Sequence, residues 1–554
     1  MSPMSPGRGD IDTAARDDAG ILVRPLQGGG RLTRDYLAGH DLSAFYSGHH
    51  SDIAAYLRKA AEVDRRLGAR SALTPAIEPL GDSAGRLGSI LDGEGFFVTT
   101  GQQPALFGGP LYTLYKILGA IRLADVLERR LGRPVLALFW IGSDDHDWDE
   151  ANHSAVLDAQ QYVQRIAVSA PAGAPAVPLS QRRWGEGVGR AVEELAAALP
   201  DTVDSRDIMA HVREAYVPQN TVAASFTATL RFLLHDRRVA FVDSAHPALR
   251  RAAAPVLRAD AVRMLAGDEP VVRQTEVLAA AGYDAQVAVA GDAANLMLLD
   301  EGGRDRIIRT ARGWTTRRER GGIGESELLD MIESEPERFS PNVLLRPVVE
   351  SAVFRTLAYV AGPGELSYFA QIGCLFAAHG ILPPVVVPRP SVTLIDGKLR
   401  RSLDRLGVDP DALRRPFREA VADTVAEDMP RDVLHALDAL RNSIVDGYDE
   451  LAAAAEGIDP TLLGPLIAAR NASLLNASAA EKKIAAQLQR KNHVKIEQLR
   501  RAAAHIQPLN APQERVFGPL PFVAAHGRAL IARIEAEIDM EPSGTASWSG
   551  PRCG

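Results

Sequence analysis

Residues 96–153 constrain the fold more than any other stretch of this chain. They begin with the apolar run FFVTT, pass through GQQPALFGGP into a helical pattern, and then read PVLALFWIGSDDHDWDEANH. Apolar side chains recur at three- and four-residue steps over residues 111–131, which predicts a helix ending at Gly132. Residues 95–100 and 134–141 are apolar runs of strand length. The stretch therefore predicts a strand, a helix and a second strand, as in a parallel α/β sheet.

Polar residues follow each of these two predicted strands directly. Gln102 and Gln103 come after the first strand, and a serine, three aspartates and a histidine come at 143–147 after the second. Ligands of open α/β sheets bind beyond the carboxyl ends of the strands. The two clusters are therefore expected to face one crevice, which predicts an active site there.

The cluster after the second strand contains Asp145, His146 and Asp147, with Asn152 and His153 close behind. So many acids after a buried strand repel one another unless a cation, a basic ligand or hydrogen bonds compensate. Histidine exchanges protons near neutral pH, so His146 is a candidate acid or base oriented by Asp145 or Asp147. Metal binding by these side chains and simple capping of a helix are the alternatives, although the spacing matches no established zinc motif.

The turn after the first strand carries glycines as well as glutamines. Gly108 and Gly109 allow the backbone to approach a ligand, and the helix that follows offers free N–H groups to an anion. Gln102 and Gln103 can each donate and accept hydrogen bonds. The turn is interpreted as a binding element for a nucleotide, an amino acid or a sugar acid, with an ordinary strand-to-helix turn as the alternative.

Two later loops are expected at the same end of the sheet. The first follows a predicted strand at 355–360 and contributes four candidate ligand-binding residues: Gly364, Glu365, Tyr368 and Gln371. Glu365 is also explained as an acid at a helix start. The second follows a predicted strand at 384–387, where Arg389 and Ser391 are candidates for binding an anion. The basic run at 304–320 is interpreted first as a solvated face.

Composition excludes several classes of protein. Hydrophobic residues make up 46% and charged residues 24%, as in ordinary globular chains, and the net charge of −8 argues against a nucleic-acid partner. Two cysteines, Cys374 and Cys553, do not make a disulfide scaffold. The first residues lack the apolar core of a secretory signal, and no apolar stretch reaches the roughly 20 residues that cross a bilayer. A cytoplasmic location without membrane association is expected.

Changes in pattern along the chain predict its organisation. From residue 433 on, apolar residues step by four and three, which is heptad spacing and predicts two long helices in an antiparallel hairpin. Two short strands are expected at 286–299, and a final helix at 522–538. The predicted segments are a disordered tail at 1–20, helices and the first half of the core at 21–154, an inserted subdomain at 155–337, the second half of the core at 338–428, a coiled-coil hairpin at 429–508, a C-terminal helix on the core at 509–541 and a disordered tail at 542–554.

Five sequence blocks resemble one known family. They are TTGQQPALFGGPLYTLYK, FWIGSDDHDWDEANH, SPNVLLRP, LAYVAGPGELSYFAQ and PQERVFGPLPF. In this order they resemble the cysteine-adding enzymes of bacillithiol biosynthesis, of the BshC type. The resemblance implies a Rossmann-like core similar to class I aminoacyl-tRNA synthetases and nucleotidyltransferases, inserted connective segments, and a coiled coil that supports a homodimer.

The resemblance also implies a reaction, in which a ligase joins cysteine to glucosaminyl malate through an amide bond. ATP or another nucleotide is the candidate for activating the carboxylate, the cofactor is otherwise left open, and no metal is expected. In this interpretation Asp145, His146 and Asp147 manage protons and bind the substrate amine. The other candidates listed above bind substrate or nucleotide. The His and Lys signature motifs of class I synthetases have no literal match in this chain.

Two further hypotheses remain open from the residues alone. One is a metal-dependent hydrolase whose ligands are Asp145, His146, Asp147 and His153. The other is a non-enzymatic interaction protein organised by its coiled coil.

Overall fold

A computed structural model describes residues 20–158, 160–170, 176–289, 291–310, 313–318, 322–544 and 548. The chain divides into two compact units. The larger comprises Met1–Ala159, Val163–Leu394 and Gln513–Gly554, and the smaller comprises Gln160–Tyr162 and Ile395–Pro512. The tails predicted at 1–20 and 542–554 fall mostly outside the described residues, as does Cys553.

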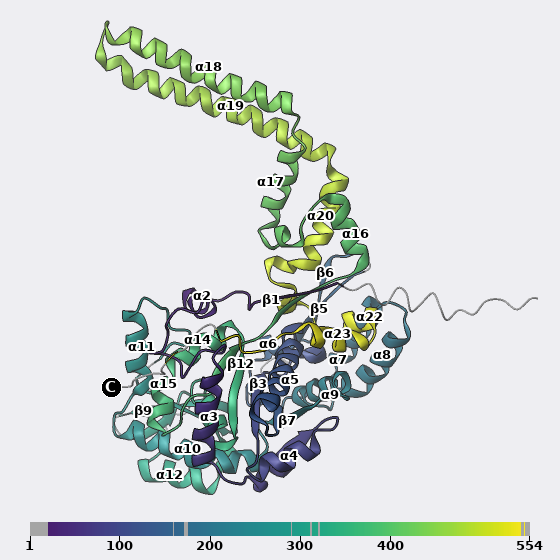
Figure 1. The fold of residues 1–554 in the computed structure, drawn as a ribbon, viewed down its shortest axis with the longest axis vertical. Helices are drawn as coiled ribbons and strands as arrows, with labels where there is room; N and C mark the ends of the chain where they lie inside the picture. Colours follow the sequence, from purple (N-terminus) through teal and green to yellow (C-terminus); the bar gives the residue numbers. More distant parts are fainter. Residues whose placement is uncertain are drawn as a thin grey trace, which may run out of the picture. The chain divides into compact units, whose positions relative to one another are not determined.

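A six-stranded sheet forms the centre of the larger unit, with the strand order β13-β12-β3-β4-β7-β2 (Figure 1). Its strands are β2 (Ile77–Pro79), β3 (Phe96–Gln102), β4 (Val135–Ile141), β7 (Val239–Asp243), β12 (Thr356–Ala361) and β13 (Val385–Pro388). All neighbouring strands are parallel except β2, which runs antiparallel to β7. The predicted α/β fold with a parallel sheet is confirmed.

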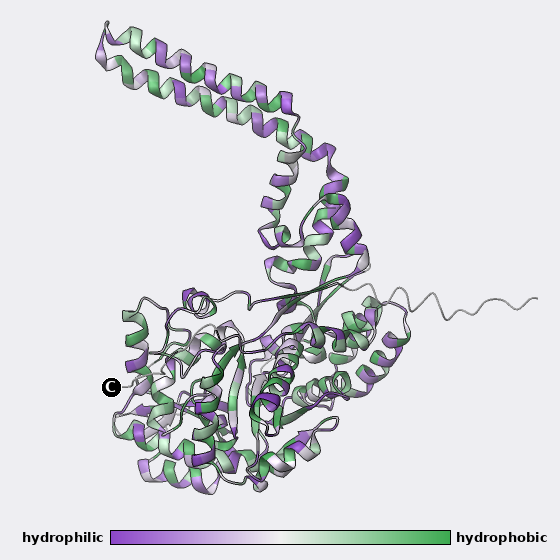
Figure 2. Cartoon of the chain, viewed as in Figure 1, coloured by the Kyte–Doolittle hydropathy of each residue, from purple (hydrophilic) through white to green (hydrophobic). Residues whose placement is uncertain are grey.

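The βαβ unit at 96–141 has the predicted form. Helix α5 (Leu111–Leu131) joins β3 to β4, and it ends at Gly132, whose φ of 65° is the left-handed conformation that glycine adopts without strain. All seven residues of β4 are buried. Because successive strand residues point to opposite faces, Phe139 packs with α5 on one face and Trp140 packs in the core of the other. Figure 2 shows these strands in the colour of apolar residues.

Helices cover both faces of this sheet. One core contains residues of α3 (Ile53–Arg66), α5 and α9 (Val222–Leu233), and the other contains residues of α4 (Ala84–Leu91), α10 (Pro247–Leu265) and α13 (Arg346–Val353). The remaining helices of the unit are α2 (Arg31–Leu37), α6 (Trp148–Ala151), α7 (Val188–Ala198), α8 (Val203–Ala215), α11 (Pro270–Ala280), α12 (Glu325–Ser334), α14 (Pro363–Gln371), α15 (Gly373–Ala378), α21 (Gln513–Val516), α22 (Leu520–His526) and α23 (Ala529–Glu537).

A second, antiparallel sheet has the order β10-β9-β8-β11. Its strands are β8 (Ala293–Asp300), β9 (Gly303–Thr310), β10 (Gly313–Thr316) and β11 (Phe339–Pro341). Two strand pairs complete the unit: β1 (Gly20–Arg24) with β14 (Ser391–Ile395), and β5 (His153–Leu157) with β6 (Val163–Ala167).

The structure differs from the sequence-based elements in three places. Two short strands were predicted within residues 286–299, and the described part of this range contains β8 alone. Strand β7, from the range predicted as an inserted subdomain, is a member of the main sheet beside β4. The single helix predicted at 522–538 is two helices, α22 and α23, because Gly527 takes a φ of 77° between them. The predicted segment boundaries themselves stay predictions.

The smaller unit is helical. It contains α16 (Gly397–Leu406), α17 (Phe417–Glu427), α18 (Arg431–Glu456), α19 (Leu463–Lys491) and α20 (His493–Ile506). Helices α18 and α19 lie side by side as a hairpin (Figure 1). Cross-helix pairs tie them together: Arg470 pairs with Asp449 at 2.7 Å, and Tyr448 shares a 3.1 Å hydrogen bond with Ser473.

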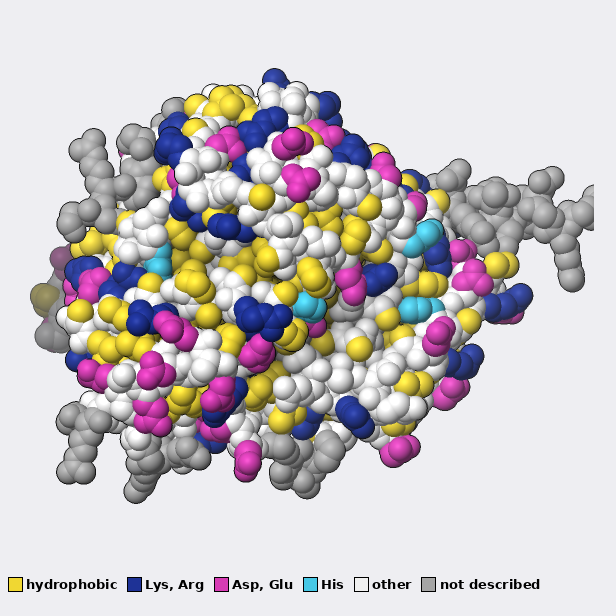
Figure 3. Space-filling model, turned by 90° about the horizontal axis from the view of Figure 1, so that it is seen from below, with side chains coloured by type: hydrophobic (Ala, Val, Ile, Leu, Met, Phe, Trp, Pro, Cys, Tyr) yellow, Lys and Arg dark blue, Asp and Glu magenta, His cyan; other side chains and the backbone are white. Residues whose placement is uncertain are grey.

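None of the described helices combines the length and hydropathy needed to cross a bilayer. On the face seen in Figure 3, lysine and arginine side chains are interspersed with aspartate and glutamate.

The close approach of β3 and β4 gives a first prediction. A Cβ on Gly95 would overlap the carbonyl oxygen of Pro134, which accepts the first strand hydrogen bond from Phe96. We expect Gly95→Ala to cost about 1–3 kcal/mol and to lower the midpoint of thermal unfolding. Gly88→Ala is the matched control, since a Cβ there meets nothing within 4 Å in α4. Its expected effect is a gain of up to about 1 kcal/mol. Equal midpoints for the two variants would contradict the close approach.

Candidate active site

A cavity of about 540 Å³ opens where β3, β4 and β12 end. Residues at or just beyond the end of each strand line it: Gln102 and Gln103 at the end of β3, Asp144, Asp145 and His146 after β4, and Gly364, Glu365 and Tyr368 after β12. The cavity is thus at the carboxyl edge of the parallel sheet, where open α/β folds bind ligands.

The glutamine turn and the acidic turn meet at this cavity. The side-chain amide of Gln103 donates a hydrogen bond to the carboxylate of Asp145. The backbones are joined as well, because the Gly142 N–H donates to the carbonyl of Gln102 at 2.9 Å. The structure therefore brings together the two clusters that the sequence placed on neighbouring strands.

Asp145 shapes the acidic turn. Its Oδ1 accepts the backbone N–H groups of His146 at 2.7 Å and of Asp147 at 3.0 Å. The carboxylate therefore orders the loop from within. The next carboxylate, Asp144, forms a buried ion pair with Arg250 of α10 and carries little free charge into the cavity.

The His146 imidazole lines the cavity, and its Nδ1 is buried without a hydrogen-bond partner among the described residues. The pairing of this ring with Asp145 or Asp147 that the sequence indicated is not formed in the described chain. Asp145 is bonded to backbone N–H groups and to Gln103 instead. A buried polar atom without a partner is available to a ligand.

Three candidates from the acidic segment lie outside the cavity lining. Asp147 caps α6, where its carboxylate accepts the Glu150 N–H at 3.2 Å, as in the alternative interpretation of simple helix capping. Asn152 follows that helix, and His153 begins β5 with its Nδ1 2.9 Å from the carbonyl of Asp149. Burial lowers the pKa of His153. These positions do not reach the cavity because the short helix carries the chain away from it.

Gly108 and Gly109 are also not brought to the cavity. Both have positive φ, 87° and 74°, and their α-carbons face α9. A Cβ on Gly108 would lie 3.1 Å from the Thr229 methyl group, and one on Gly109 would lie 3.4 Å from the Phe226 ring. The two glycines serve a close helix contact in place of the predicted ligand contact.

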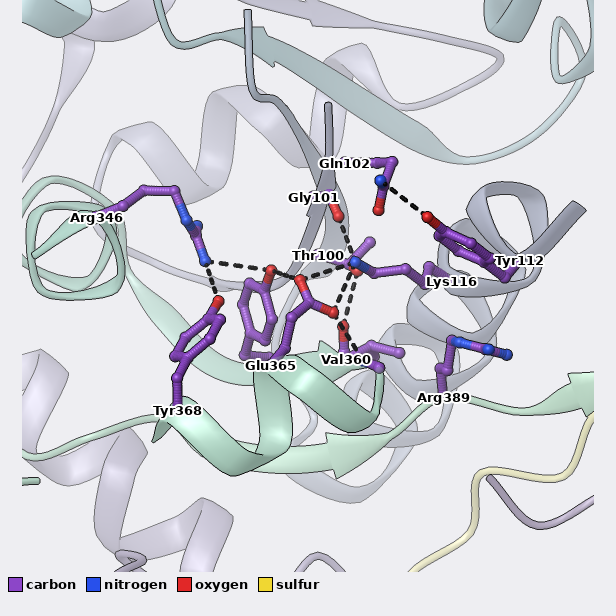
Figure 4. Close-up of polar contacts among 12 residues, drawn as sticks. Thr100, Gly101, Gln102, Tyr112, Lys116, Arg346, Val360, Glu365, Tyr368 and Arg389 are labelled. Carbon is purple, nitrogen blue, oxygen red and sulfur yellow. Dashed lines mark hydrogen bonds and ion pairs between the residues drawn. The ribbon is translucent and has the colours of Figure 1, made fainter. Parts of the chain in front are cut away.

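A buried ion pair forms part of the cavity wall (Figure 4). Lys116 of α5 lies 2.7 Å from a carboxylate oxygen of Glu365, and its ammonium also donates to the carbonyl of Gly101. Glu365 additionally accepts the Tyr359 hydroxyl at 2.6 Å and the Gly362 N–H at 2.7 Å. Burial alone would raise the pKa of Glu365, but the Lys116 ammonium and the hydrogen bonds from Tyr359 and the Gly362 N–H together outweigh burial, and they hold that pKa below its usual value.

Arg346, the first residue of α13, extends this network. Its guanidinium donates to Glu350 at 2.8 Å, to the Tyr368 hydroxyl at 2.9 Å and to the Tyr359 hydroxyl at 3.2 Å. It also lies over the Trp140 ring at 5.8 Å from the centroid. Figure 4 shows the chain of contacts from this arginine to the ion pair.

Of the three remaining predicted site residues, one lines the cavity and two are buried away from it. Arg389 lines the cavity, but its guanidinium is paired with buried Glu514 at 2.7 Å. Ser391 donates to the same carboxylate at 2.9 Å and does not reach the cavity. Gln371 is buried away from it, where it accepts the Val287 N–H at 2.9 Å. These two polar residues tie segments together.

Several lining residues were not predicted from the sequence. They are Tyr112 and Lys116 of α5, Arg304 and Arg306 of β9, Asn342, Arg346, Tyr359 and Arg515. A signal existed for Lys116, since a lysine in the apolar stripe of a helix needs a buried partner. Arg346 lies in SPNVLLRP, one of the five blocks that resemble the BshC type of enzyme. Nothing in the sequence distinguished Arg304 and Arg306 from the other arginines of the basic run at 304–320, which was interpreted as a solvated face.

No three His, Cys, Asp or Glu side chains of the described residues gather in a way that could hold a metal ion. The hydrolase hypothesis required Asp145, His146, Asp147 and His153 to converge. Only Asp145 and His146 of that set line the cavity.

Fold and cavity together define an α/β protein of the Rossmann-like class with a strand-end site and an appended helical hairpin. Family models give the class a name. Residues 24–390 match the N-terminal Rossmann-like domain of bacillithiol biosynthesis BshC, and residues 392–541 match its C-terminal coiled-coil domain. The chain belongs to the BshC family.

Relatives with the printed name "Putative cysteine ligase BshC" support this membership. The protein from Salinibacter ruber is 32% identical over 80% of this chain and 81% of its own length. The protein from Solibacter usitatus is 30% identical over 92% of this chain and 95% of its own length. These names are those of ligases, so the family favours an enzyme over the non-enzymatic hypothesis.

The buried ion pair gives a second prediction. In Glu365→Gln the Lys116 ammonium loses its carboxylate while it stays buried, and we expect a loss of about 3–5 kcal/mol in stability. In the double variant Lys116→Met with Glu365→Gln neither charge is buried, and much of that loss should be recovered. Chemical denaturation of wild type, both single variants and the double variant measures the coupling. Additive effects of the two substitutions would contradict a direct interaction.

Proposed function

We propose that this protein is a cysteine ligase that joins the carboxyl group of cysteine to the amine of glucosaminyl malate, in the cavity at the end of β3 and β4. One observation carries the proposal: the Asp145 carboxylate and the His146 imidazole, whose Nδ1 has no hydrogen-bond partner among the described residues, lie at one edge of a cavity of substrate size. Family membership supports the choice of reaction.

The chemistry requires activation of a carboxylate. The cysteine carboxylate attacks the α-phosphorus of ATP or another nucleotide, and pyrophosphate leaves. The substrate ammonium loses one proton to solvent, and the neutral amine then attacks the acyl carbon. The new C–N bond forms, the C–O bond to the nucleotide breaks, and the nitrogen gives up a second proton. Cationic side chains at the cavity, such as Arg515, suit the phosphate charge.

Each cavity residue has a role that follows from its state in the structure. Asp145 binds the substrate ammonium, and His146 accepts the proton that the nitrogen releases, because its buried Nδ1 has no described partner. The amides of Gln102 and Gln103 orient the activated carboxyl group. Arg389 contributes less to anion binding than the sequence indicated, since Glu514 neutralises it.

Substitution of the two acidic-turn residues gives a third prediction. We expect Asp145→Ala and His146→Ala each to reduce formation of the cysteinyl product by at least about 100-fold. The matched control is Asp149→Ala, an exposed acid on α6 in the same segment, which should keep turnover within about threefold of wild type. Product is measured by mass spectrometry, and thermal unfolding shows whether each variant is folded. Near-normal turnover in both cavity variants would remove the assigned roles.

We further propose that the protein forms a homodimer through its coiled coil. Large apolar side chains remain exposed on the hairpin of the isolated chain, among them Leu451 at 51%, Leu463 at 52% and Leu475 at 71%. Burial of such residues against a second copy is the usual explanation of an apolar stripe on a long helix.

Sedimentation of the full chain gives a fourth prediction. Wild type should sediment as a dimer at micromolar concentration, and Leu451→Glu with Leu475→Glu should sediment as a monomer, since charges would be buried in the interface. Leu57→Glu is the control, because Leu57 is 50% exposed on α3 of the larger unit. Dissociation by the control, or a dimer that survives both hairpin substitutions, would argue against this interface.

A further inference from the structure

Strand β9 presents alternate basic residues to the cavity. Arg304 and Arg306 are two residues apart and both line it, while Asp305 between them is buried on the other face of the strand. Met297 of β8 lies directly opposite Arg306 in the strand pairing and also lines the cavity. One face of the antiparallel sheet is therefore a wall of the cavity, and this wall carries two guanidinium groups.

The two guanidinium groups are in different states. Arg304 is fixed in place, because its Nε donates to the Ser340 hydroxyl at 2.9 Å and an Nη atom donates to the carbonyl of Pro341 at 3.0 Å. Arg306 is half-buried, yet its guanidinium makes no hydrogen bond or ion pair with any described residue. Its nitrogen atoms are not among the enclosed polar atoms, so they are open to the cavity and can donate hydrogen bonds to a ligand there.

Charges of opposite sign adjoin this wall. Asp145 and Arg304 both line the cavity and interact electrostatically, so the acidic turn and the basic strand face the same space. A ligand that carries a cationic amine and anionic carboxylates satisfies both sides at once. A polyphosphate placed against Arg304 and Arg306 would satisfy only the basic side.

We propose that Arg304 and Arg306 form a subsite for the carboxylates of the amine-bearing substrate, with Arg306 as the main ligand. The subsite rests on the proposed function for the identity of that substrate. The planar guanidinium of Arg306 binds one carboxylate through two parallel hydrogen bonds. Arg304, which Ser340 and Pro341 hold in place, adds a second positive charge. With its carboxylates held there, the substrate places its amine beside Asp145 and His146.

Binding of L-malate tests the subsite without turnover. The full chain is titrated with L-malate, inorganic phosphate and ATP in separate calorimetric experiments. We expect Arg306→Gln to weaken L-malate binding by about tenfold to a hundredfold, and Arg306→Lys to weaken it less, because the charge remains while the paired hydrogen bonds are lost. Binding of phosphate and ATP should stay within about threefold of wild type in both variants.

Arg317→Gln is the matched control. Arg317 is an exposed arginine that acts electrostatically on Arg306 and does not line the cavity, so its loss removes nearby positive charge without removing a ligand. L-malate binding should change by less than about threefold in this variant. If Arg317→Gln weakened L-malate binding as much as Arg306→Gln does, the effect would come from net positive charge alone, and the subsite would be overturned.

Steady-state kinetics provide a second measurement. In Arg306→Gln the KM for glucosaminyl malate should rise by about tenfold to a hundredfold, with kcat and the KM for cysteine nearly unchanged. The subsite would be overturned if wild type did not bind L-malate. It would also be overturned if Arg306→Gln lost binding of phosphate and ATP while it kept binding of L-malate. Arg306-dependent L-malate binding in a protein that forms no cysteinyl product would instead refute the proposed function and leave the subsite standing.

Discussion

The parallel pairing of β3 with β4 is the constraint on which the cavity depends. The two strands pair residue by residue from Phe96 opposite Val135 to Gln102 opposite Ile141, so both end at the same level. The turns that follow therefore emerge side by side, and Gln103 can reach Asp145. A slip of one residue would turn the buried face of either strand toward the wrong core and would separate these side chains.

Buried charge makes this edge of the sheet rigid. Lys116 with Glu365 and Arg346 with Glu350 are ion pairs with little exposure, and two tyrosine hydroxyls join them into one network. Such a network is stable only when every member has its partner, which limits the arrangements it can adopt. The wall on that side is thus preorganised. The Arg306 guanidinium and the His146 Nδ1 have no partner among the described residues, so they keep their hydrogen-bonding capacity for a ligand.

Local patterns were sufficient for the central elements. The predicted helix at 111–131 has the same bounds as α5, because its apolar spacing and terminal glycine act within one segment. The site was predicted less completely. Asp147 and Asp145 look alike in sequence, since a helix cap and a cavity carboxylate use the same residue type, and only the path of the chain separates them.

The missed residues share a physical reason. Arg304 and Arg306 reach the cavity only because the antiparallel sheet is folded against the end of the parallel one, and that packing joins residues far apart in the chain. The alternation that aims both arginines at the cavity is visible in the sequence, but a strand and a solvated basic run share that composition. The single helix predicted at 522–538 failed for a local reason, the positive φ of Gly527.

The pairing of Arg389 with Glu514 has a consequence for how the chain matures. Arg389 is synthesised before the segment Ile395–Pro512 of the helical unit, and its counter-charge, Glu514, is synthesised after that segment. A nascent polypeptide that stops anywhere between these points holds a guanidinium with no carboxylate to neutralise it. The charge pair in this part of the cavity wall therefore forms only after the chain has been synthesised past Glu514.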